Sequence, residues 1–129
     1  MIAYIVDDAA LVAGLAAGTE SQRRELSRLV HGSLDGGPPL NIPALCLTAA
    51  VTVRSAIAEH AAMLVTDSPA GVVEIRGLAG GQLAGIIAEY PGLGYPAAHA
   101  VSEATRDGAV ILTVDVDRYA GVPVSAIAL

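Results

Sequence analysis

Short apolar runs alternate with helical patterns along the 129-residue chain, and this alternation constrains the fold more than any other feature. Buried strands read as short continuous apolar runs bounded by turn residues, whereas helices repeat apolar residues every three or four positions. Strands that alternate with helices form a mostly parallel sheet. The length suits a single domain. The sequence therefore predicts one α/β domain that spans residues 1–129.

The predicted strands are rich in Val, Ile and Leu, and two of them are followed directly by an aspartate. They span residues 2–6, 40–42, 71–75, 109–114 and 122–129. In parallel sheets, functional groups gather at the carboxyl ends of the strands. Asp7 and Asp115 follow the two strongest runs, so we expect them to meet in one crevice at that edge of the sheet.

The predicted helices have recognisable start and stop residues. They span residues 9–17, 19–34, a long segment from Pro43 towards Met63, 79–89 and 96–106. Asp8 is predicted to cap the first helix, Gly18 to end it and Gly108 to end the last helix. Thr19 and Gln22 form a capping-box pattern at the start of the second helix, in which the side chain of each residue accepts from the backbone N–H of the other.

Composition narrows the classes of function. The net charge is −6, with seven arginines and no lysine, which argues against sequence-independent binding to nucleic acid. No apolar run approaches the length of about 18 residues that a transmembrane helix needs, and no basic region opens the chain. We therefore expect a cytoplasmic protein without a membrane partner. Cys46, the only cysteine, is predicted to be buried and inert.

Several polar residues allow both a structural and a functional interpretation. Asp8 is interpreted as a helix cap rather than a ligand, and Asp117 as the start of a turn that it stabilises together with Arg118. His99 is interpreted as a structural histidine, with a hydrogen-bond role beside an acidic pocket as the alternative. The two other histidines, His31 and His60, are predicted to lie on solvated helix faces.

Four segments carry a family resemblance that covers nearly the whole chain. They are "IVDDAALVA" at 5–13, "NIPALCLTAA" at 41–50, "AAHAVSEATRDGAVILTVDVDRYAG" at 97–121 and "VPVSAIAL" at 122–129. In this order they resemble a PIN domain, the fold of VapC-type toxin ribonucleases. The resemblance implies a three-layer α/β/α domain with a mostly parallel central sheet.

The resemblance also implies a metal site and shows which of its residues are missing. PIN nucleases hold Mg²⁺ or Mn²⁺ with three or four acidic residues. Asp7 matches the first of these positions and Asp115 the last, with Asp117 close behind. Ala49 and Ala97 stand where two other acidic residues are expected. Hard cations prefer several oxygen ligands, and two of the expected carboxylates are missing. Asp7, Asp115 and Asp117 would therefore make a weak site.

Two functions follow from the resemblance. The first is a PIN-like protein that binds a protein or RNA and has little or no nuclease activity, as a homodimer or with an antitoxin-like partner. The second is an active Mg²⁺-dependent endoribonuclease toxin, in which Asp7 and Asp115 would be the catalytic residues. A domain with unrelated ligand binding is the third alternative.

Overall fold

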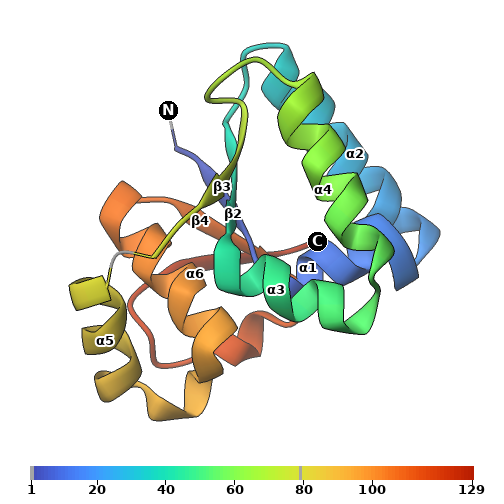
Figure 1. Ribbon diagram of the computed structural model, residues 1–129. Coiled ribbons are helices and arrows are strands. Elements are labelled where there is room, and N and C mark those ends of the chain that lie inside the picture. Colours follow the sequence, from blue (N-terminus) through green and yellow to red (C-terminus); the bar gives the residue numbers. More distant parts are fainter. Residues whose placement is uncertain (1, 79) are drawn as a thin grey trace.

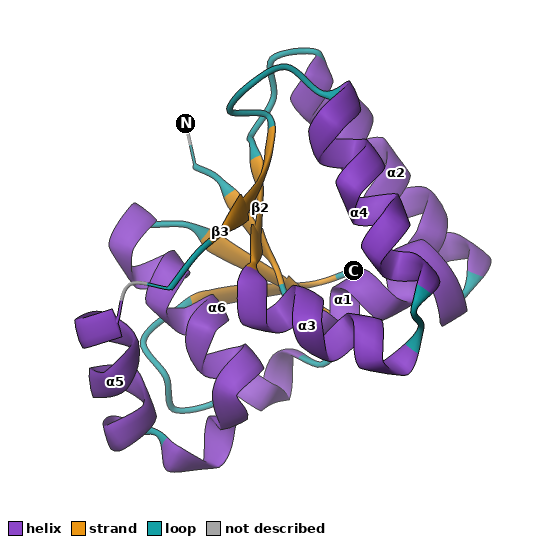
Figure 2. Ribbon diagram, viewed as in Figure 1, coloured by secondary structure: helices purple, strands orange, loops and turns teal. Residues whose placement is uncertain are grey.

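In the computed structural model, which describes residues 2–78 and 80–129, five parallel strands form the central sheet. The strand order is β3-β2-β1-β4-β5, and every neighbouring pair is parallel. The strands are β1 (Tyr4–Val6), β2 (Leu40–Pro43), β3 (Val73–Arg76), β4 (Val110–Thr113) and β5 (Ser125–Ala128). This arrangement confirms the predicted α/β fold and its parallel sheet (Figure 1, Figure 2).

Helices and short helical turns connect the strands. The helices are α1 (Asp8–Val12), α2 (Glu20–Leu34), α3 (Ala44–Val53), α4 (Ala56–Asp67), α5 (Gly80–Glu89) and α6 (Gly94–Asp107). The turns are η1 (Ala13–Ala17), which is π-helical, and the 3₁₀ turns η2 (Pro91–Leu93) and η3 (Val116–Tyr119). The predicted start of the fourth helix, Ala79, lies outside the described residues. No helix in the described ranges is long and apolar enough to span a membrane.

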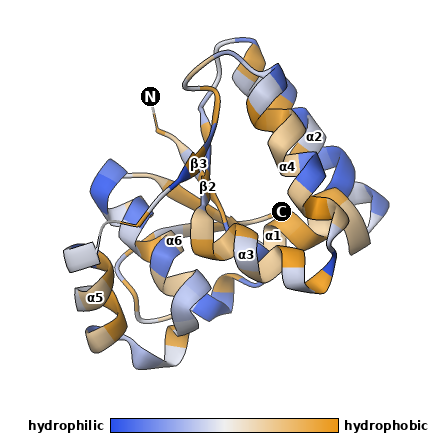
Figure 3. Ribbon diagram, viewed as in Figure 1, coloured by the Kyte–Doolittle hydropathy of each residue, from blue (hydrophilic) through white to orange (hydrophobic). Residues whose placement is uncertain are grey.

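The helices lie on both sides of the sheet and complete three layers. α6 packs across β1, β2 and β4, and α5 packs on α6. Figure 1 shows these two helices on one side of the sheet, with α2 and α4 on the other. Ile5 and Ile111 pair across β1 and β4 and are fully buried in the core between the layers. The helices differ in hydropathy: α3 is mostly apolar along its length, whereas α2 carries many hydrophilic residues (Figure 3).

The segment after Pro43 forms two helices, so the prediction of one long helix is wrong. Arg54 has extended backbone angles, φ −142° and ψ 105°, between α3 and α4. The β-branched residues Val51, Thr52 and Val53 precede it, and such residues are weak helix formers. The Thr52 hydroxyl also donates to the Ala49 carbonyl oxygen at 2.6 Å, a bond that bends helices. After the break, α4 starts in a new direction.

Two helix ends agree with the sequence patterns. The Thr19 hydroxyl accepts from the Gln22 N–H at 3.1 Å, and the Gln22 side chain accepts from the Thr19 N–H at 2.9 Å, which completes the predicted capping box. Gly108 ends α6 with a positive φ of 62°, a conformation that glycine adopts without steric strain. These local devices fix where α2 and α6 begin and end relative to the sheet.

Candidate functional site

Asp7 lies at the carboxyl end of β1 and is completely buried. Its backbone N–H donates to the Leu112 carbonyl oxygen of β4 at 3.2 Å, and its Oδ1 accepts from the Ala10 N–H at 2.9 Å. Asp7 is therefore the N-cap of α1. The prediction that Asp8 caps this helix is wrong, because Asp8 is already the first helical residue. Its side chain turns towards η3 instead.

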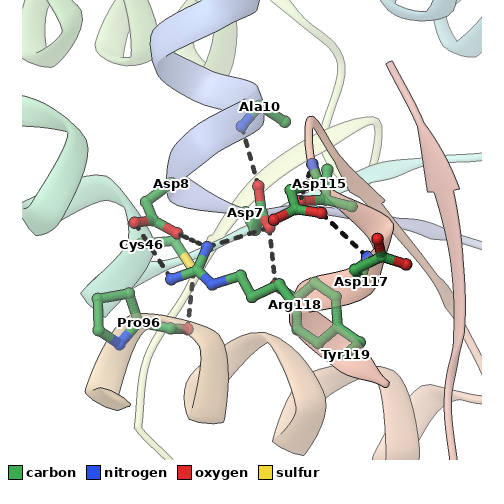
Figure 4. Close-up of polar contacts among 10 residues, drawn as sticks. Asp7, Asp8, Ala10, Cys46, Pro96, Asp115, Asp117, Arg118 and Tyr119 are labelled. Carbon is green, nitrogen blue, oxygen red and sulfur yellow. Dashed lines mark hydrogen bonds and ion pairs between the residues drawn. The ribbon is translucent and has the colours of Figure 1, made fainter. Parts of the chain in front are cut away.

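Arg118 and Tyr119, from η3, supply the polar partners of these two aspartates (Figure 4). The Arg118 guanidinium donates to Asp8 Oδ1 at 2.6 Å, to Asp8 Oδ2 at 3.4 Å and to Asp7 Oδ2 at 3.3 Å. The Tyr119 hydroxyl donates to Asp7 Oδ2 at 2.7 Å. Both carboxylates are therefore bound by groups of the same chain. Asp117 and Arg118 both lie in the turn η3, and the Arg118 side chain pairs with Asp7 and Asp8.

Burial dominates the acid–base properties of this cluster. It raises the pKa of Asp7, and hydrogen bonds from Thr113, Ala10 and Tyr119 together with the charge of Arg118 only partly oppose this. Burial and the neighbouring negative charge of Asp7 raise the pKa of Tyr119, so its hydroxyl remains a proton donor. Burial alone would lower the pKa of Arg118, but hydrogen bonding to Asp8 and the charge of Asp8 outweigh it and raise that pKa.

We expect a pH dependence of stability from Asp7. A carboxyl group whose pKa rises on folding takes up a proton when the chain folds. Its contribution to stability is therefore fully present below the ordinary pKa of 3.8 and is lost as the pH rises through the higher folded pKa. Asp7→Asn removes this term but keeps a good N-cap. The free energy of unfolding of the wild type, relative to Asp7→Asn, should thus increase when the pH falls from neutral towards 3.8.

Urea unfolding of both proteins at a series of pH values measures this difference. Each unit of pKa difference between the folded and unfolded states is worth about 1.4 kcal/mol. All other titrating groups are common to the two proteins, so their contributions cancel to first order. A difference that stays constant, or that shrinks as the pH falls, would contradict the expected protonation of Asp7.

Asp115 and Asp117 lie at the same edge of the sheet as Asp7, but their side chains are exposed to solvent. Asp115 follows the end of β4, the strand next to β1, and both residues are exposed. The Asp115 Oδ1 accepts from the Asp117 N–H at 3.1 Å, so Asp115 caps the turn η3. Figure 4 draws Asp7, Asp115 and Asp117 around this turn. Whether Asp7 and Asp115 act together in catalysis stays a prediction.

A hollow of about 410 Å³ opens beside Asp8. Its walls are mainly small apolar side chains of α1, η1 and α3, and its polar side chains are Asp8 and Gln22. The lining residues are Asp8, Ala9, Val12, Ala13, Ala17, Gly18, Gln22, Ala49, Ala50, Val53 and Val114. Ala49 thus faces a hollow that Asp8 shares, whereas Ala97 is completely buried in α6.

The donor set does not suit a divalent cation. Mg²⁺ needs several oxygen ligands in near-octahedral geometry. Both oxygens of Asp7 are engaged by N–H or O–H donors, and Asp8 holds the Arg118 guanidinium. Within the described ranges, no group of three or more His, Cys, Asp or Glu side chains is arranged to hold a metal ion. A cation at Asp7 would have to displace both Tyr119 and Arg118.

His99 is buried in α6 and takes part in a hydrogen-bond network with two other segments. Its side chain is 1% exposed. The Leu45 N–H donates to His99 Nδ1 at 3.2 Å, so a neutral ring carries its proton on Nε2, which lies 3.1 Å from the Gly77 carbonyl oxygen. Nε2 is also 3.5 Å from Glu103 Oε1. The ring therefore ties α6 to the start of α3 and to the segment after β3.

Cys46 is buried, as predicted, and lies close to the aspartates (Figure 4). Its thiol donates to the Pro96 carbonyl oxygen at 3.0 Å. Burial, followed by the negative charges of Asp8 and Asp7, raises the pKa of Cys46 well above its ordinary value. The thiol therefore stays protonated and acts as a packing group between α3 and α6.

Comparison with known proteins gives a structural match at low sequence identity. No family model matches the chain, and no curated protein matches it. The crystal structure of PAE2754 from Pyrobaculum aerophilum is similar, with a TM-score of 0.55 and 19% sequence identity. The match covers 98% of this chain and 89% of the archaeal protein. At this identity the likeness concerns the fold alone: the chain has the same α/β architecture as this archaeal protein.

Proposed function

We propose that the chain is a PIN-like domain that acts by binding a macromolecular partner and has little or no nuclease activity. The observation that carries this proposal is the state of the acidic residues at the carboxyl edge of the sheet. Asp7 and Asp8 are bound by Arg118, and Tyr119 also donates to Asp7. Ala49 and Ala97 stand where the PIN resemblance expects acidic residues. A metal-activated water would have few oxygen ligands to hold and orient it.

The hollow beside Asp8 favours a protein partner over RNA. Binding to a phosphate backbone depends on Lys and Arg contacts. The residues that line the hollow include neither, and the chain carries a net charge of −6. Alanine and valine walls instead offer an apolar surface to a side chain of a partner. The PIN resemblance suggests an antitoxin-like peptide or a second copy of the chain as this partner. A cytoplasmic location is part of the same proposal.

The alternative function is a Mg²⁺-dependent endoribonuclease toxin. It draws on one observation, namely that Asp7 and Asp115 follow neighbouring strands of the sheet. In that case Asp7 and Asp115 would be required for activity, and Mg²⁺ or Mn²⁺ would be the cofactor. The two functions differ in whether RNA is cleaved, so a cleavage assay separates them.

We expect the purified protein to leave structured RNAs intact in Mg²⁺ or Mn²⁺, at the background level of its Asp115→Ala variant. Asp115 is exposed and its side chain accepts one local hydrogen bond, so this variant should fold and is a suitable control. Cleavage that needs added metal and disappears in both Asp115→Ala and Asp7→Asn would establish the endoribonuclease instead. Sedimentation velocity at several protein concentrations tests the homodimer separately, and a monomer throughout would remove that part of the proposal.

A further inference from the structure

The two adjacent carboxylates at the start of α1 share one guanidinium group. Arg118 Nη1 lies 2.6 Å from Asp8 Oδ1 and 3.3 Å from Asp7 Oδ2, and its Nη2 lies 3.4 Å from Asp8 Oδ2. Figure 4 shows the Arg118 side chain reaching back from η3 so that its head lies between the two aspartates. The guanidinium therefore lies between the two carboxylates and bonds to both.

The position of Arg118 is fixed by its neighbours along the chain. Tyr119 is 4% exposed and packs in the core, and its hydroxyl donates to Asp7 Oδ2 at 2.7 Å. The Arg118 N–H donates to the Asp115 carbonyl oxygen at 3.2 Å, which holds the turn η3. The side chains of Arg118 and Asp8 are only 24% and 22% exposed. The guanidinium is thus positioned by the fold and partly shielded from water.

We propose that Arg118 is the resident cation of this site and that it excludes divalent metal ions from Asp7 and Asp8. This deepens the proposed function and rests on it, because it assigns to Arg118 the loss of metal binding by the two aspartates that are present. A guanidinium repels a divalent ion within a few ångströms, and the repulsion is strong where water is partly excluded. Mg²⁺ also loses its water shell reluctantly, and the bound hydrogen-bond donors leave it few free oxygens.

The test compares the wild type with Arg118→Gln, using Mn²⁺ alone as the probe. Binding is followed by electron paramagnetic resonance of free Mn²⁺, and stability by thermal unfolding with and without Mn²⁺ or Mg²⁺. We expect no Mn²⁺ binding by the wild type and no metal-dependent change in its melting temperature. Arg118→Gln should melt roughly 3–5 °C lower, because two neighbouring carboxylates lose their counter-ion.

Added Mn²⁺ should restore part of the lost melting temperature in Arg118→Gln, because a ligand that binds only the folded state stabilises it. A second change, Asp8→Asn, should abolish this response by removing one of the two carboxylates. Arg28→Gln is the matched control. Its side chain pairs with Glu25 on the exposed face of α2, so its loss should change neither the melting temperature appreciably nor the response to metal.

The proposal would be overturned if the wild type bound Mn²⁺ and lost this binding in Asp7→Asn or Asp8→Asn. It would also be overturned if Arg118→Gln folded but gave no response to metal. If Arg118→Gln does not fold, Arg118→Met, which keeps an apolar stem without the charge, takes its place in the same Mn²⁺ comparison. Metal binding without RNA cleavage would refute this inference and leave the proposed function standing, whereas RNA cleavage would refute the proposed function.

Discussion

Ala97→Asp is expected to lower the free energy of unfolding by about 4 kcal/mol or more. Ala97 is completely buried in α6, at a position where the PIN resemblance expects an acidic residue. A carboxylate introduced there must lose its hydration and find space in a packed interior. Urea or thermal unfolding measures the loss. The substitution would therefore fail to rebuild an acidic site, because the surroundings of Ala97 have closed around a methyl group.

Ala49→Asp is the matched control, since it adds the same group to a different environment. Ala49 is partly exposed and faces the 410 Å³ hollow, so its new carboxylate can remain hydrated. We expect a change within about 1 kcal/mol, mainly from helix propensity and from repulsion by nearby Asp8. Equal losses for the two variants would mean that burial is not the cause. A small loss for Ala97→Asp would show that the site still accepts an acidic residue.

His99→Ala is expected to lower the free energy of unfolding by about 3–5 kcal/mol. The substitution removes the acceptor for the Leu45 N–H and the donor to the Gly77 carbonyl oxygen, and it leaves a cavity in α6. It also removes the ring nitrogen 3.5 Å from Glu103 Oε1, a buried oxygen without a hydrogen-bond partner among the described residues. Glu103 would keep only its contact with Arg106, 2.5 Å from Oε2. Chemical denaturation at neutral pH measures the effect.

His31→Ala and His60→Ala are the controls for this loss. Both histidines are exposed on helices, in α2 and α4, so their replacement should change the free energy of unfolding by less than about 0.5 kcal/mol. His99→Gln should fall between His99→Ala and the wild type, because an amide can supply one of the two hydrogen bonds. If all three alanine variants were alike, the buried network around His99 would contribute nothing to stability.

The sequence predicted the sheet and its local devices because these depend on neighbouring residues. The capping box of Thr19 and Gln22 involves residues three positions apart, and Gly108 ends α6 through its own backbone freedom. The runs that became β1 and β4 are apolar enough to be read without partners. Such features are determined by residues that lie within a few positions of one another in the sequence.

The break at Arg54 and the roles of the two aspartates were not predicted, for two different reasons. The β-branched run before Arg54 was a usable signal, but the apolar pattern continued across it to Ile57 and outweighed it. Asp7 and Asp8 are both good caps by residue type, and only the first residue of α1 decides between them. The helix α1 begins at Asp8, one residue earlier than predicted, so Asp7 is the buried cap and Asp8 is the partly exposed ion-pair partner.

Arg118 and Tyr119 are the partners of Asp7 that the sequence did not predict. They follow it by more than 110 positions, and no local pattern connects them. A usable hint was that an arginine and a tyrosine follow the strand-end Asp115 in a chain with few of either. Only the pairing of β1 with β4 brings the turn η3 back to the start of α1.

The central place of β1 also has a consequence for how the chain folds. β1 can pair with β2, from Tyr4 to Leu40, once a short stretch of chain has closed. Its other neighbour, β4, and the Tyr119 bond to Asp7 require a loop of more than a hundred residues, 112 for that bond. Contacts of such separation slow folding. We therefore expect the contacts of Asp7 with Arg118 and Tyr119 to form late in folding, after β1 has paired with β2.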